Sequence, residues 1–153
     1  MIELILSSIF IGIIATAGMS TFLWIITGFN IAQVDMVKAI GSLYTKDEKT
    51  AMLPGLLMHF TAGIVFCFGY LILFKIFPIG DHSPLLFVAL GSLLGIVHGV
   101  VVSLLLIIAV AEHHPLESFK KAGVAVAIFH FLAHLIYGLI IGLYYCLLQI
   151  GLN

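Results

Sequence analysis

Residues 123–150 read GVAVAIFHFLAHLIYGLIIGLYYCLLQI, an apolar run that contains no Asp, Glu, Lys or Arg. This run exceeds the roughly 20 residues that an α-helix needs to cross the hydrocarbon core of a bilayer. Three further apolar runs, at about residues 2–28, 53–77 and 84–111, are also long enough. Open strands cannot span lipid, because their unpaired backbone groups find no partner there, and four strands are too few to close a barrel. The sequence therefore predicts an all-α four-helix transmembrane bundle.

The composition supports one integral membrane domain over residues 1–153. The chain is 63% hydrophobic and only 8% charged, far outside the range of soluble domains. Its net charge of -1 leaves no basic surface for nucleic acid, so the expected surroundings are the lipid bilayer. No lysine precedes the first run, and the run continues past the small residues around Ala17, so we expect a retained helix there, not a cleaved leader.

The connections between the runs carry most of the charge. The first connection places apolar residues at helical spacing from Ile31 to Tyr44, which predicts a short interfacial amphipathic helix after the first span. The lysines gather on the first and third connections, with Lys75 alone on the other side. Because positively charged loops stay in the cytoplasm, both termini are predicted to be non-cytoplasmic.

A weak internal repeat relates the second and fourth runs. The pattern His59-x3-Gly63-x6-Tyr70 recurs as His134-x3-Gly138-x6-Tyr145. It favours a bundle built as two helical hairpins of the same orientation. Chance matching between apolar helices that contain glycine and tyrosine is the alternative, and the sequence leaves both open.

Each run also carries a stripe of small residues at helical spacing. Such stripes let membrane helices approach closely. The residues predicted to pack in this way are Gly12, Thr16, Gly63, Gly91, Gly95, Gly99 and Gly138.

Four histidines lie inside the apolar runs, where an ionisable group is costly and usually faces the bundle interior. A helix rises about 1.5 Å per residue, so the position of each histidine relative to the lysine-rich connections gives its expected depth. His59 and His130 fall in the inner third, and His98 and His134 fall near the middle. His113 and His114 would extend this column to the mouth of the bundle as an access or proton path.

Three hypotheses account for the column. His98, His134, His130 and His59 could bind zinc or copper through neutral imidazoles, or His98 and His134 could hold haem b as an axial pair. The histidines could instead carry protons or cations, in an oligomeric transporter or channel. Finally, neutral histidines could join the helices through hydrogen bonds to Thr16, Ser20, Ser103, Tyr70 or Tyr137.

No catalytic constellation is recognisable, because the aspartates lie in connections far from the serines of the spans. The chain is therefore predicted not to be an enzyme. The leading hypothesis is a subunit of a larger membrane assembly, respiratory or redox in kind, whose histidine cluster binds a metal or haem. Other membrane subunits, or a second copy of the chain, are the expected partners.

One motif in the first run is Gly12-x3-Thr16-x2-Met19, and another in the second run is His59-x3-Gly63-x2-Phe66-x3-Tyr70. These two motifs carry a resemblance that covers most of the chain. The chain resembles uncharacterised small four-helix bacterial inner-membrane proteins, for which no activity is assigned. This resemblance implies four helices and a bacterial inner membrane, and it leaves the function open.

Overall fold

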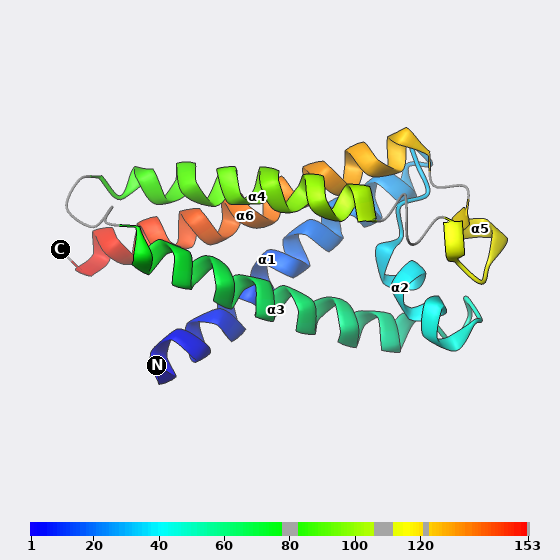
Figure 1. Ribbon diagram of the computed structural model, residues 1–153, viewed down its shortest axis with the longest axis horizontal. Helices are drawn as coiled ribbons and strands as arrows, with labels where there is room; N and C mark the ends of the chain where they lie inside the picture. Colours follow the sequence, from blue (N-terminus) through cyan, green and yellow to red (C-terminus); the bar gives the residue numbers. More distant parts are fainter. Residues whose placement is uncertain (78–82, 106–111, 121–122, 153) are drawn as a thin grey trace.

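The computed structural model describes residues 1–77, 83–105, 112–120 and 123–152, and these residues form helices joined by short connections (Figure 1). Four of the helices are long and apolar enough to cross a membrane, so the chain is a small polytopic membrane protein. The predicted all-α four-helix bundle is confirmed. Residues 106–111, at the end of the third apolar run, and Lys121 lie outside the described residues. In chain order the helices are α1 (Ile2–Gly28), α2 (Met36–Thr45), α3 (Met52–Ile76), α4 (Leu85–Leu105), α5 (Glu117–Lys120) and α6 (Val124–Leu152).

Among the long helices, α4 and α6 form a close pair, and α1 connects this pair to α3. Helices α4 and α6 run side by side, and α3 lies along the opposite side of the bundle (Figure 1). Helix α1 crosses obliquely and packs on both α3 and α6, whereas α3 and α4 touch only sparsely. Helices α2 and α5 lie together at one end, which we call the α2 end, and both termini lie toward the other (Figure 1).

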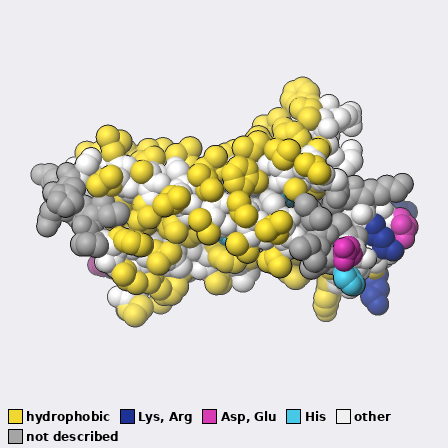
Figure 2. Space-filling view, turned by 45° about the horizontal axis from the view of Figure 1, so that its top comes forward, with side chains coloured by type: hydrophobic (Ala, Val, Ile, Leu, Met, Phe, Trp, Pro, Cys, Tyr) yellow, Lys and Arg dark blue, Asp and Glu magenta, His cyan; other side chains and the backbone are white. Residues whose placement is uncertain are grey.

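Apolar and charged side chains occupy different parts of the surface along the length of the bundle. Apolar side chains cover the length of the bundle, and charged side chains gather at the α2 end (Figure 2). The exposed residues of the long helices include many Ile, Leu and Val side chains, as expected for faces turned to lipid. At the α2 end, the Lys38 amine lies 3.5 Å from the carboxylate of Glu48 and 4.0 Å from that of Asp35.

Glycines bring α4 and α6 into backbone contact. A Cβ built on Gly95 would lie 2.8 Å from the carbonyl oxygen of His134, and one on Gly99 would lie 2.9 Å from that of Phe131. A Cβ on Gly138 would meet the carbonyl oxygen of Gly91. Any side chain at these positions would push the two helices apart, so the pair depends on glycine.

Helix α2 is the amphipathic segment after the first span, and local chemistry explains where it begins and ends. The side chain of Asp35 accepts a hydrogen bond from the Lys38 backbone N–H (3.0 Å), a typical N-cap, and Lys46 ends the helix with a φ of 56°. Gly41 of α2 lies directly against Gly55 of α3, backbone to backbone. The apolar face of α2 is therefore covered by α3, and Val37 is buried.

Candidate functional site: two cavities joined by histidines

Three of the four membrane histidines line one cavity inside the bundle. This histidine cavity has a volume of about 140 Å³ and is bounded by α1, α2, α3, α4 and α6. It receives His59 from α3, His98 from α4 and His134 from α6. Thr16, Gly63 and Tyr137 close its inner wall, and Ala62 and Phe66 of α3 lie at its outer edge, where both are exposed.

His98 and His134 contact each other across the α4–α6 pair. Their ring centroids are 4.6 Å apart in an edge-to-face arrangement, which places the two side chains at the same depth. The Phe66 ring lies 4.3 Å from the His98 ring, and the Tyr70 hydroxyl lies 3.3 Å from Nδ1 of His98. The His98 ring is therefore held between α3 and α6, and it remains partly exposed.

The two histidines of α6 each bond to the backbone one turn earlier. Nδ1 of His130 lies 2.7 Å from the carbonyl oxygen of Val126, and Nδ1 of His134 lies 2.8 Å from that of His130. Because a carbonyl oxygen can only accept, Nδ1 carries the hydrogen in both neutral rings, and Nε2 is an acceptor. In this tautomer each ring points a basic nitrogen away from its own helix.

Several buried polar atoms have no hydrogen-bond partner among the described residues. They are Nε2 of His59, Nε2 of His130, the Thr16 hydroxyl and the Ser20 hydroxyl. Unsatisfied polar atoms are costly in a bilayer, so their presence marks places that can bind a polar group. Two of them, on His59 and Thr16, belong to residues of the histidine cavity.

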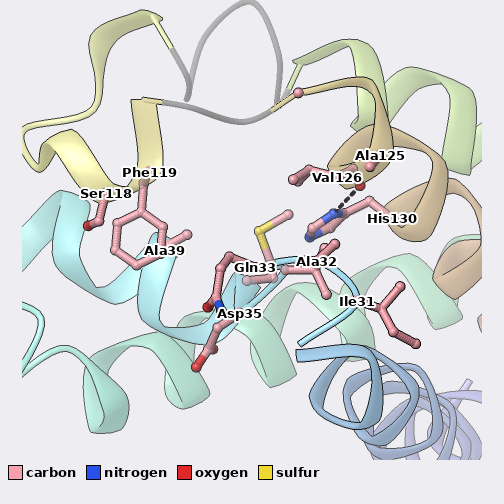
Figure 3. A pocket seen from close by; sticks show the side chains of 13 residues that line it. Ile31, Ala32, Gln33, Asp35, Ala39, Ser118, Phe119, Ala125, Val126 and His130 are labelled. Atoms are coloured by element: carbon pink, nitrogen blue, oxygen red, sulfur yellow. Dashed lines mark hydrogen bonds between the residues drawn. The ribbon is translucent and has the colours of Figure 1, made fainter. Parts of the chain in front are cut away.

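His130 faces a different cavity, at the α2 end (Figure 3). This mouth pocket, of about 470 Å³, is lined by residues from the segment before α2, from α2 itself, from α5 and from the start of α6. The imidazole of His130 points into it from α6, and Asp35 and Phe119 approach from the other sides (Figure 3). Met36 lines both cavities, so its side chain lies between them.

The structure thus divides the predicted column of four histidines. His59, His98 and His134 share the histidine cavity, whereas His130 lines the mouth pocket. Sequence reasoning did not find Asp35, Met36 or Phe119, since an N-cap, a methionine and a loop aromatic carry no signal of a cavity. Depth counting along single helices was also unable to show which helix faces would meet.

The far side of the histidine cavity, toward the termini, is filled by aromatic rings. Phe74, Phe87 and Tyr145 form a cluster with ring centroids 4.7 to 5.6 Å apart. Phe74 and Phe87 are almost fully buried. This aromatic cluster fills the bundle interior between the histidine cavity and the end that carries the termini.

His113 and His114, the predicted access path, have different surroundings. His113 is exposed. His114 is buried: its Nδ1 accepts a hydrogen bond from the Leu116 backbone N–H (3.0 Å), and its Nε2 lies 3.0 Å from the carbonyl oxygen of Ala39. His114 therefore ties the third connection to α2, and neither residue lines the two cavities.

The geometry offers little to a metal or to haem. Among the described residues, no three His, Cys, Asp or Glu side chains are placed to hold a metal ion. An axial pair must face each other across the haem plane, but the rings of His98 and His134 are in contact. The helices are also close at this depth, since a Cβ built on Gly99 would lie 3.2 Å from the Cβ of His134.

Of the five hydroxyl groups predicted as histidine partners, one contacts a histidine, two bond to the backbone, and those of Thr16 and Ser20 have no partner among the described residues. Tyr70 does contact His98. The Ser103 hydroxyl, in contrast, donates to the carbonyl oxygen of Ala127, and the Tyr137 hydroxyl donates to that of Gly63. Hydrogen bonds between helices therefore run mainly from hydroxyl groups to the backbone.

Comparison with known proteins adds no assignment. No protein-family model matches the chain, and neither the curated proteins nor the solved structures contain a significant match. Any functional conclusion must therefore come from the two cavities.

Proposed function

We propose that this protein is a one-sided histidine proton relay, which carries protons between the α2 end and the centre of the bundle. One observation carries the proposal. On consecutive turns of α6, His130 lines the mouth pocket and His134 lines the histidine cavity, and each holds its Nδ1 hydrogen on a backbone carbonyl. A neutral imidazole in this tautomer can accept a proton at Nε2, carry it as an imidazolium while Nδ1 keeps its hydrogen bond to the carbonyl, and release it again from Nε2.

Protons fit the site better than metal cations do. Among the described residues no carboxylate lines the histidine cavity, so a permanent positive charge there would have no counter-charge from them. Imidazoles avoid this problem because they become charged only while a proton passes. The single carboxylate of the mouth pocket, Asp35, lies at the α2 end, where protons would be collected.

The proposed relay ends inside the protein, because the aromatic cluster of Phe74, Phe87 and Tyr145 blocks the way to the other side. A relay that ends at mid-membrane needs a group that takes up the protons. This supports the expectation that the chain works beside other membrane subunits in a respiratory or redox assembly, and it replaces the bound metal or haem of the leading hypothesis.

A purely structural role is the second candidate, and one observation favours it. Each Nδ1 hydrogen bond of His130 and His134 stays within α6 and satisfies one of the two ring nitrogens. If the histidines only stabilise the bundle, their replacement should change its stability without changing the access of protons to the interior.

Hydrogen exchange at individual imidazoles separates these candidates. The chain, labelled with nitrogen-15 at histidine and held in lipid nanodiscs, is transferred to deuterated buffer, and exchange of the His134 ring N–H is followed by NMR. The relay predicts that His130→Leu slows this exchange by about 10-fold or more, since a positioned acid–base group contributes on the order of 100-fold or more to proton transfer. Exchange at the His114 ring, outside the cavities, should be unchanged.

The matched control is His113→Leu, which removes an exposed imidazole from the same end of the protein. It should leave His134 exchange unaltered. Equal rates in wild type and His130→Leu would refute the relay and favour the structural role. Net proton flux across sealed vesicles, in contrast, would show that the path crosses the whole bundle and would overturn the one-sided part of the proposal.

A further inference from the structure

The histidine cavity differs from an ordinary packing defect in three respects. Its walls are largely apolar, two buried polar atoms of its lining residues have no partner, and it reaches the outer surface of the bundle between α3 and α4. We propose that it binds the head group of a lipid-soluble aromatic molecule that carries ring oxygens, of the quinone or quinol class. The inference builds on the proposed relay, because the cavity is where the relay ends.

The size of the cavity fits a single ring. A volume of about 140 Å³ is close to that of the roughly 150 Å³ engineered protein cavity that holds one benzene molecule. The rings of Phe66, His98 and Tyr137 form part of the walls. Flat aromatic side chains of this kind favour stacked or edge-on contact with another ring.

The polar atoms fit oxygen substituents on that ring. Nε2 of His59 and the hydroxyl of Thr16 are both buried and find no hydrogen-bond partner in the part of the chain that the structure describes, and both residues are more than nine-tenths buried. Thr16 lies against Gly63, which follows His59 by four residues on α3, so the two atoms are offset by about one helical turn. A hydroxyl or carbonyl on the ring would give each a hydrogen bond, whereas an acyl chain would leave both unsatisfied.

The access route runs sideways from the lipid. Ala62 and Phe66, which line the cavity on α3, are exposed on the outside of the bundle, and His98 on α4 is partly exposed. Helix α3 and helix α4 diverge toward the α2 end (Figure 1). A molecule dissolved in the bilayer can therefore reach the cavity without passing through water, with its tail remaining among the lipid chains.

Binding is tested on the full chain in lipid nanodiscs, labelled with nitrogen-15 at histidine. The probe is a benzoquinone with one isoprene unit, added in its oxidised and reduced forms. We expect saturable NMR shifts of the His59 and His134 rings that reach one probe per chain. Thr16→Val, which keeps the shape but removes the hydroxyl, should weaken binding by about 5-fold or more, as expected for one hydrogen bond.

A matched pair of variants tests the access route. Ala62→Phe places a ring at the outer edge of the cavity and should abolish the shifts. Val65→Phe places the same ring on the lipid-facing side of the same helix, 62% exposed and outside the cavity lining, and should leave them intact. Equal behaviour of the two variants would overturn the lateral route.

Two further probes test the ligand class. An alkylbenzene lacks the oxygens, and a long-chain alcohol lacks the ring; both should bind more weakly than the quinone. Equal binding of the alkylbenzene would show that the cavity binds any apolar ring and would overturn the role of the oxygens. Tighter binding of the alcohol would assign the site to a lipid hydroxyl. Because these shifts are measured without proton transfer, the ligand proposal and the relay can fail separately.

Discussion

The hydroxyl of Tyr137 on α6 donates a hydrogen bond to the backbone carbonyl of Gly63 on α3. The same glycine lies so close to α1 that a Cβ on it would meet the Thr16 hydroxyl. Gly63 is thus the point at which three of the four long helices meet. The inner wall of the histidine cavity is built on this junction, so its rigidity controls the shape of the site.

Removal of the Tyr137 hydroxyl should loosen this junction. Tyr137→Phe leaves the ring in place and deletes the hydrogen bond, which we expect to cost about 1 kcal/mol in the free energy of unfolding, within the range for bonds between membrane helices. Unfolding in mixed micelles measures the loss. Tyr144→Phe, on the same helix but only half-buried, is the control and should change the stability little. A neutral Tyr137→Phe would contradict the role of this bond.

Two glycine substitutions should have opposite effects. Gly138→Ala puts a methyl group against the Gly91 carbonyl oxygen and should separate α4 from α6, at a cost of about 1–3 kcal/mol. At Gly69 of α3, a Cβ would have no atom within 4 Å. Gly69→Ala should therefore be neutral or stabilise the helix by up to about 1 kcal/mol. Thermal unfolding compares the two variants, and similar losses in both would show that the α4–α6 contact is looser than described.

His114 should matter for the loop and not for the cavities. His114→Ala deprives the Leu116 N–H of its acceptor and releases α2 from the third connection. We expect hydrogen exchange of the Leu116 amide to accelerate by about 10-fold, which corresponds to roughly 1.4 kcal/mol. His113→Ala, one residue away and exposed, serves as the control. Unchanged exchange in His114→Ala would mean that other contacts hold the loop.

The lysine distribution predicts that the mouth pocket faces the cytoplasm. Both native cysteines are buried, so a substituted cysteine can be labelled selectively. With an impermeant maleimide, Lys75→Cys should react in intact cells, and Lys49→Cys should react only after permeabilisation. The reverse pattern would place the termini in the cytoplasm and turn the proposed relay to face the other side.

Hydropathy alone was enough to predict the four spans and the amphipathic helix, because a bilayer imposes a length and a composition on each element. Hydropathy was less informative about which face of each helix points into a cavity. His130 and His134 are four residues apart and share one side of α6, yet they line different cavities. His113 and His114, predicted as an access or proton path, line neither cavity, and His114 is buried against α2.

The sequence by itself determined that the chain is helical, that it lies in a membrane and that its interior is rich in imidazoles, since each follows from the composition of single helices. Only the tertiary structure decided which of these side chains meet. The oblique crossing of α1 and the glycine contact of α4 with α6 depend on shape complementarity between different helices. The spacing of residues within one helix does not show which helices fit together. These contacts leave His59 and Thr16 unpartnered beside one small cavity, and that arrangement carries the functional proposals.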